Sequence, residues 1–329
     1  MLNRHIFRLR HALGVTLLCS LLSVALGPRA ALANEPINVV ATTGMIADAA
    51  RQVGGDLVDV TGLMGAGVDP HAYRQTRSDI VALARADLVL WHGLYLEAQM
   101  EEFMRDLERD GNVVAVAEAM PKDLLIAHDT YTEKYDPHVW MAPALWTHVV
   151  AAVRDALIAT RPEDEATFRA NADAHLAEID ALVAYTTEIL ATVPEDRRVL
   201  VTAHDAFNYF GRAYDFDVVG IQGISTESEA GLRRVRDLVD LLVGKKVAAV
   251  FVESSVSDRN VRALIEGAAS RGHDVAIGGT LFSDAMGEPG TYEGTYVGMI
   301  DHNATVIARA LGGDAPATGM NGLLATAGQ

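Results

Sequence analysis

Cysteine is almost absent from this chain of 329 residues, in which Cys19 is the single example. Cys19 lies inside an apolar run near the N-terminus, and a chain cut after that run would hold no thiol. The absence excludes disulfide frameworks and thiolate metal sites from the remaining protein. Any transition metal must therefore be held by histidine, aspartate or glutamate.

Basic side chains are also scarce. The 27 lysines and arginines face 44 aspartates and glutamates, which gives a formal net charge of -17. Nucleic-acid binding requires a basic face, so this balance argues against a nucleic-acid partner. An acidic surface raises the local concentration of cations, so the charge is compatible with a cationic ligand and equally with solubility alone.

The one long apolar run covers residues 12–26 and is short for a membrane-spanning helix, which needs ~20 residues. Three arginines precede the run, and the small-x-small sequence ALA, which ends at Ala33, follows it. These features predict a secretory signal peptide over residues 1–33. Leu18 stands where a lipoprotein signal requires a small residue before Cys19, so we expect a free periplasmic protein.

After the signal segment, strand-like runs alternate with amphipathic helical runs, and this alternation is typical of parallel sheets covered by helices. We expect an α/β fold of two lobes, each built from (βα)-type units around a parallel sheet. The strand-like runs are 37–43, 57–64, 88–93 and 112–119 in the first block, and 197–203, 217–221, 246–253 and 274–279 in the second. Helical runs such as 96–107 lie between them.

The blocks are joined by a different kind of segment. Residues 162–193 contain no glycine, and their apolar positions recur at spacings of three and four, which predicts a helix of roughly 45 Å. A helix of this length is a rigid linker, and we expect His175 on its solvated face. The predicted organisation is a signal peptide at 1–33, an N-terminal lobe at 34–145, helices including the linker at 146–194, and a C-terminal lobe at 195–329.

The tripeptide Asp-Pro-His occurs twice, as Asp69-Pro70-His71 and as Asp136-Pro137-His138. Proline fixes φ near −65°, and the aspartate before it is able to accept a hydrogen bond from a backbone N–H or from an imidazole ring. Each copy therefore predicts a stiff turn that presents one imidazole.

Two further metal-ligating side chains follow strand-like runs. His204 comes directly after 197–203, and Asp284 follows 274–279. Ligands of α/β proteins bind beyond the carboxyl ends of parallel strands, so these side chains and the two Asp-Pro-His turns are candidates for one site between the lobes. We predict metal ligation by His71, His138, His204 and Asp284, with Asp69, Asp136, His92 and Glu253 as supporting groups around them.

Motifs of catalysis are few. The chain has no G-x-S-x-G elbow, no HExxH and no dinucleotide-binding fingerprint. A zinc-dependent hydrolase stays open as an alternative, with His71, His138 and Asp284 holding the metal and a water molecule in an open position. A surface or adhesive protein with a structural metal is a second alternative.

Six segments together resemble one known family: VDPHAY, YDPHVWMAP, VTAHDAFNYFGRAYDF, GISTESEAG, VFVESSVSDRNV and GGTLFSDAMG. The chain is similar over nearly its whole mature length to the zinc/manganese-binding solute receptors of bacterial ABC transporters, solute-binding protein family 9. The resemblance implies two α/β lobes joined by a long rigid helix and the same four ligands. It implies a monomeric periplasmic receptor, not an enzyme, that delivers Zn²⁺ or Mn²⁺ to an inner-membrane ABC permease.

The chain departs from the family pattern at four places. Ala142 replaces a common aspartate, and His92 replaces a common asparagine. Segment 122–135 lacks the long histidine- and acid-rich loop of zinc-dedicated members, with His128 its one histidine. His204 stands where manganese-leaning members often have glutamate, and three imidazoles favour zinc. We therefore expect binding of both metals, zinc more tightly, and leave open whether the physiological metal is zinc, manganese or another such as iron.

Overall fold

The structure is a computed structural model that describes residues 35–128 and 131–325. The predicted signal peptide lies outside these described residues. Within the described ranges, no helix is long and apolar enough to cross a membrane.

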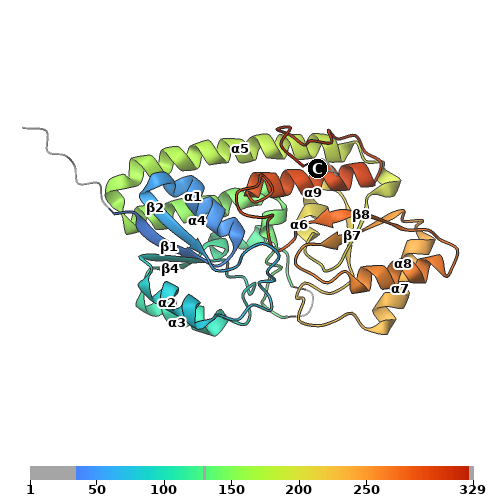
Figure 1. The fold of residues 1–329 in the computed structure, drawn as a ribbon, viewed down its shortest axis with the longest axis horizontal. Helices are drawn as coiled ribbons and strands as arrows, with labels where there is room; N and C mark the ends of the chain where they lie inside the picture. Colours follow the sequence, from blue (N-terminus) through green and yellow to red (C-terminus); the bar gives the residue numbers. More distant parts are fainter. Residues whose placement is uncertain (1–34, 129–130, 326–329) are drawn as a thin grey trace, which may run out of the picture. The chain divides into compact units, whose positions relative to one another are not determined.

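The first lobe is built on a four-stranded sheet in which all neighbouring strands are parallel, in the order β2-β1-β3-β4 (Figure 1). Because its strands are all parallel, their carboxyl ends lie at one edge of the sheet. They are β1 (Ile37–Ala41), β2 (Val58–Gly62), β3 (Leu88–Trp91) and β4 (Val113–Ala115).

Both faces of this sheet are covered, as a parallel sheet requires. Val39 and Ala41 belong to the core that includes α1 and α4, whereas Val40 packs in a second cluster with Leu83 of α2 and Met104 of α3. Successive side chains of one strand point to opposite faces, so both faces of β1 carry buried apolar side chains. The covering helices are α1 (Gly44–Gly54), α2 (Arg77–Arg85), α3 (Glu101–Asp110) and α4 (Pro143–Thr160).

The second lobe contains two parallel strand pairs among the described residues. β5 (Val199–Thr202) pairs with β6 (Asp217–Gly220), and β7 (Ala249–Glu253) pairs with β8 (Ala276–Leu281). Val201, Val250 and Leu264 are buried in one cluster that joins both pairs to α7 and α8. The helices of this half are α6 (Asn208–Tyr214), α7 (Leu232–Gly244), α8 (Arg259–Ala269) and α9 (Tyr296–Ala310).

The linker helix α5 (Glu165–Ala191) follows a 3₁₀ turn at Pro162–Asp164. Its 27 residues span about 40 Å. The helix packs against α1 and α4 of the first lobe and against α6 and α9 of the second, as Figure 1 shows for its course beside α9. The predicted α/β fold of two lobes with parallel sheets and a long rigid linker helix is therefore confirmed.

Three local expectations need correction. His175 is buried, because it continues the apolar stripe of Phe168 and Ala172 at the next helical turn of α5. The helix expected at 96–107 begins only at Glu101, since Leu94 and Tyr95 adopt positive φ and form an irregular turn. The strand expected at 112–119 ends at Ala115 and continues as a 3₁₀ turn, Val116–Ala119.

Candidate metal site

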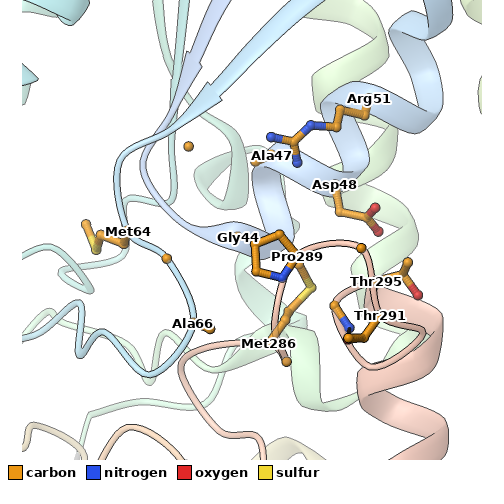
Figure 2. A pocket seen from close by; sticks show the side chains of 15 residues that line it. Gly44, Ala47, Asp48, Arg51, Met64, Ala66, Met286, Pro289, Thr291 and Thr295 are labelled. Carbon is orange, nitrogen blue, oxygen red and sulfur yellow. Dashed lines mark hydrogen bonds between the residues drawn. The ribbon is translucent and has the colours of Figure 1, made fainter. Parts of the chain in front are cut away.

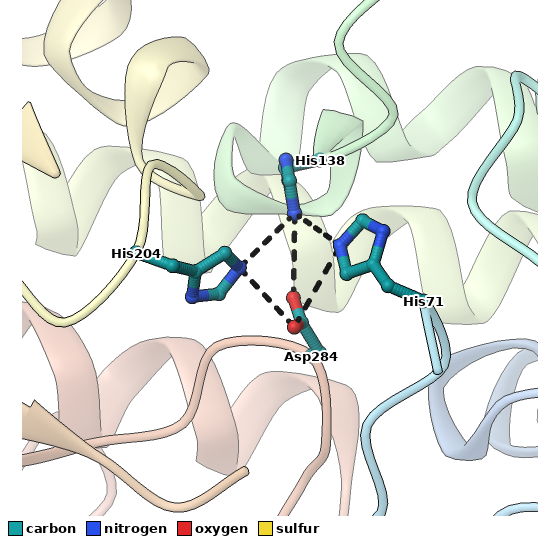
Figure 3. Close-up of side chains that lie close together, drawn as sticks. All are labelled: His71, His138, His204 and Asp284. Atoms are coloured by element: carbon teal, nitrogen blue, oxygen red, sulfur yellow. Dashed lines mark hydrogen bonds and ion pairs between the residues drawn. The ribbon is translucent and has the colours of Figure 1, made fainter. Parts of the chain in front are cut away.

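Four buried side chains converge where the two lobes meet (Figure 3). The Nε2 atom of His138 lies 3.3 Å from Nε2 of His71 and 3.4 Å from Nε2 of His204. Asp284 closes the group, with carboxylate oxygens 3.4 Å from Nε2 of His138 and 3.2 Å from Nε2 of His204. One ligand-type atom from each residue lies within 4.8 Å of all the others.

Each member of this cluster follows or precedes a regular element, so the backbone fixes where its side chain starts. His71 lies in the loop after β2, His204 follows β5, and Asp284 follows β8. His138 directly precedes the 3₁₀ turn Val139–Met141. The structure thus brings together all four residues that the sequence placed at strand ends and loops.

The two Asp-Pro-His turns share one backbone device. The carboxylate of Asp69 accepts the backbone N–H of His71 at 2.9 Å, and that of Asp136 accepts the backbone N–H of His138 at 2.9 Å. Asp136 also accepts a bond from Nδ1 of the His138 ring at 2.7 Å. This second bond leaves Nε2 of His138 as the atom with a lone pair for the cluster.

Glu253, at the end of β7, holds both the backbone and the ring of His204. Its carboxylate accepts the backbone N–H of His204 at 2.9 Å and the ring Nδ1 at 2.5 Å. Both residues are buried, so the pair fixes the orientation of the imidazole without competition from water.

His92 lies behind the His138 turn. Its Nε2 donates to the carbonyl of Pro137 at 2.8 Å, and its ring packs edge-on against Trp140. Burial lowers the pKa of His92 to about 3, so the ring is neutral and supports the turn as a hydrogen-bond donor. It is not among the four converging residues.

Charge in the cluster is balanced by carboxylates. Burial opposes a charged ring, yet Asp136 and Asp284 outweigh burial and raise the pKa of His138 to about 9. The pKa of His204 is likewise raised despite burial, through Asp284 and Glu253. Burial lowers the pKa of His71 to about 3. Burial favours protonation of Asp284, but the facing imidazoles hold its pKa well below the usual range.

Several supporting residues were not found from the sequence. Asn208 donates to Asp136 Oδ2 at 3.0 Å, and the hydroxyl of Tyr209 donates to the Asp136 carbonyl at 2.8 Å. Asn208 is the first residue of α6, four residues after His204. Nε1 of Trp140 donates to the carbonyl of Ser283, the residue before Asp284, at 2.8 Å, and no sequence pattern predicts that contact.

Buried Glu97 is another residue that the sequence did not indicate. It accepts the hydroxyl of Thr42 and the backbone N–H groups of His92 and Gly93. Burial raises the pKa of Glu97 to about 7. The glutamate thereby holds the irregular turn after β3 that positions His92.

A separate cavity of about 610 Å³ lies between α1, the end of β2 and the segment before α9, and none of the four converging residues lines it (Figure 2). Asp48 points toward it from α1, but its Oδ2 already accepts the backbone N–H of Tyr296 at the start of α9. The candidate metal cluster is therefore a buried group that lies outside this cavity.

Two α/β lobes around a buried set of three imidazoles and one carboxylate define a two-lobed metal-binding protein. A family model described as zinc-uptake complex component A, periplasmic (ZnuA), matches residues 39–310, and the chain belongs to this family. As a member, it is a solute receptor for divalent transition metals of ABC transporters rather than an enzyme. The family predicted from the sequence is thus confirmed, and the hydrolase alternative is not supported.

Three relatives illustrate the similarity. The manganese-binding lipoprotein MntA of Bacillus subtilis is 48% identical over 279 residues, which cover 85% of this chain and 91% of the relative. The zinc-binding protein TroA of Treponema pallidum is 45% identical over 287 residues, 87% of this chain and 92% of TroA. Its structure superposes with a TM-score of 0.82 over 84% of this chain and 99% of that one. The iron-binding protein YfeA of Yersinia pestis is 32% identical over 279 residues, 84% and 87% of the two chains.

Proposed function

We propose that this protein binds one divalent transition-metal ion through His71, His138, His204 and Asp284 and delivers it to the permease of an ABC transporter. Asp136 and Glu253 orient two of the imidazoles, Asp69 holds the backbone of His71, and His92 supports the His138 turn. The ion is the transported cargo.

The separation of the ligand atoms is the observation that carries this proposal. A tetrahedral site with metal–nitrogen bonds of 2.0–2.1 Å has edges of roughly 3.3 Å. The nitrogen–nitrogen separations of 3.3 and 3.4 Å and the nitrogen–oxygen separations of 3.2 and 3.4 Å are close to that edge length, whereas Nε2 of His71 lies 3.9 Å from Oδ2 of Asp284. A closed tetrahedral shell leaves no open position for a hydrolytic water, which also speaks against the hydrolase alternative.

The identity of the cargo is proposed from chemistry. Zinc binds imidazole sites more tightly than manganese or ferrous iron does, so the three-histidine set favours zinc at equilibrium. The two carboxylate oxygens of Asp284 would also serve a metal of higher coordination number. The relatives are named for manganese, zinc and iron respectively. We propose that zinc binds most tightly and that manganese binds too, with availability deciding which is carried.

Location and organisation follow as further proposals. A signal peptide over 1–33 would release a free protein into the periplasm, where it would act as a monomer. We propose lobes at 34–145 and 195–329 with the linker helices between them at 146–194. The acidic charge of the chain supports a cationic cargo over a nucleic-acid partner.

The proposed site is tested by titrating the metal-free protein with zinc and with manganese by calorimetry. We expect one site for each metal, with the smaller dissociation constant for zinc. The His204→Ala variant should bind zinc more than about 100-fold more weakly, because loss of a ligand exceeds the 10–100-fold effect of losing an outer partner.

His148→Ala, in α4 and outside the converging group, serves as the matched control and should bind as the wild type does. Unchanged zinc affinity in His204→Ala would refute the four-ligand site. Binding of neither metal to the wild type would refute the proposed cargo.

A further inference from the structure

A loop of the second lobe reaches the turn that carries His71. The segment GISTESEAG, residues 223–231, lies between β6 and α7. The hydroxyl of Thr226 in this loop donates to Oδ2 of Asp69 at 2.5 Å. The other oxygen of Asp69 accepts the backbone N–H of His71 at 2.9 Å. Thr226 therefore contacts the metal cluster through one carboxylate.

A second contact joins the same two regions. The side-chain amide of Gln99, just before α3, donates to the carboxylate of Glu227. Thr226 and Glu227 are consecutive, so this short piece of the second lobe is tied to the first lobe at two points. Ile224, near the start of the loop, is 3% exposed.

The other cluster residues are tethered more deeply. The His138 turn is held by Asn208 and Tyr209, and the segment before Asp284 is held by the buried indole N–H of Trp140. Thr226 and Asp69 are instead partly exposed, so water competes for their bond. Partly exposed polar contacts on loops open at lower free energy than contacts in a buried core.

We propose that Thr226 is a positioning residue that latches the His71 turn, and that opening the Thr226–Asp69 bond is the step that frees His71 from the metal during release. This inference rests on the proposed four-ligand site. The latch couples the 223–231 loop of the second lobe to the His71 turn of the first lobe, so a small separation of these two loops is enough to break it.

The consequence is kinetic. Without the Thr226–Asp69 hydrogen bond, Asp69 still accepts the backbone N–H of His71 but is no longer held by the second lobe. The turn that carries His71 therefore moves away from the metal more often. Metal entry, which occurs while the turn is open, does not require the bond. The structure therefore assigns Thr226 an effect on the dissociation rate and little effect on the association rate.

The test is the Thr226→Val variant of the full protein, loaded with zinc and mixed rapidly with excess EDTA. Loss of a hydrogen bond to a charged group is expected to speed zinc release about tenfold. Thr226→Ser keeps the hydroxyl and should release zinc as the wild type does. Thr160→Val is the matched control, since the Thr160 hydroxyl bonds only within α4, to the Ala156 carbonyl at 2.9 Å.

Two results would overturn the latch. One is a release rate of Thr226→Val equal to that of the wild type. The other is a Thr226→Val variant that is less stable in urea when metal-free and in which zinc association slows as much as zinc release accelerates. That pattern indicates that the hydroxyl has a merely structural role. Thr226→Ala replaces the valine variant if the latter does not fold.

The experiments distinguish a failure of the latch proposal from a failure of the four-ligand site. If His204→Ala binds zinc like the wild type, the ligand set itself is wrong and the latch falls with it. If His204→Ala loses zinc while Thr226→Val releases it normally, the site stands and only the latch is refuted.

Discussion

At the scale of single residues, the two Asp-Pro-His turns have the same sequence but different surroundings. Asp136 bonds both the backbone and the ring of His138, whereas Asp69 bonds the backbone of His71 and the hydroxyl of Thr226. The ring of His138 is therefore held by its own aspartate, whereas Asp69 holds only the backbone of His71. Glu253 gives His204 the same ring support from a different strand.

The residue-scale prediction concerns this ring support. Glu253→Gln keeps the shape of the side chain but replaces a carboxylate acceptor by a neutral amide, which weakens the hold on His204 Nδ1–H. Zinc affinity should fall about 10–100-fold, as for other outer partners of metal-bound histidine. Calorimetric titration measures the change.

The exposed Glu188→Gln on α5 is the control for this substitution, since it makes the same chemical change far from the cluster. Equal zinc affinity in Glu253→Gln and wild type would show that the Glu253 carboxylate does not tune the site.

At the scale of elements, α5 ties the lobes by a continuous apolar face. Its buried positions contact α1 and α4 at one part of the helix and α6 and α9 at another, and the hydroxyl of Tyr185 bonds Thr305 of α9 at 3.0 Å. Because one stiff helix packs against both lobes, it restricts their relative movement.

The element-scale prediction is made at Leu182, which is fully buried on this face. Leu182→Ala removes apolar contacts and leaves a cavity, so the free energy of unfolding should fall by about 2–5 kcal/mol. Urea denaturation of the metal-free protein measures it. The control substitution Glu188→Ala, at an exposed position, should change the free energy of unfolding by less than about 0.5 kcal/mol.

A Leu182→Ala variant as stable as Glu188→Ala would show that the linker is not packed as described. Zinc affinity should change little in either variant, since α5 supplies none of the converging side chains.

At the scale of the whole molecule, protonation of the buried cluster makes both the stability of the fold and the affinity for metal depend on pH. The folded pKa of His138, about 9, lies above the ordinary histidine value of about 6.5. The stabilisation that protonated His138 contributes to the folded protein is therefore complete below pH 6.5 and is lost as the pH rises toward 9. The lowered pKa values of Asp136 and Asp284 act at the acid end, where their contribution is lost as pH falls.

The whole-molecule prediction follows from replacing protons by metal. Because the ring nitrogens must be deprotonated to bind, zinc binding at pH 7 should release about one to two protons and become tighter as pH rises toward 9. Calorimetry in two buffers of different ionisation enthalpy counts the protons. The increase of Tm on zinc addition should grow between pH 6.5 and 9.

Proton release near zero at pH 7 would show that the rings of His138 and His204 are neutral before zinc arrives. A Tm increase that is constant from pH 6.5 to 9 would lead to the same conclusion.

The sequence by itself determined the class of fold and the ligand types. Alternating apolar runs of strand and helix length require parallel layers, and a chain without cysteine in its mature part leaves histidine and carboxylates as ligands. Strand ends and the proline turns also indicated which four side chains to consider. These are local properties, set by periodicity and by backbone restriction at proline, so they are readable from neighbouring residues.

The sequence indicated Glu253 and Asp69 as supporting groups, but only the tertiary structure decided which atoms they bond and which further groups, such as Trp140 and Thr226, join them. The bonds of Glu253 to His204, Trp140 to Ser283 and Thr226 to Asp69 join residues distant in sequence. The last two bonds join the two lobes and depend on how they dock, whereas the first depends on how β5 and β7 pack within one lobe, and no local pattern encodes either arrangement. The burial of His175 was readable from its helical spacing, whereas the late start of α3, after the positive φ of Leu94 and Tyr95, was not.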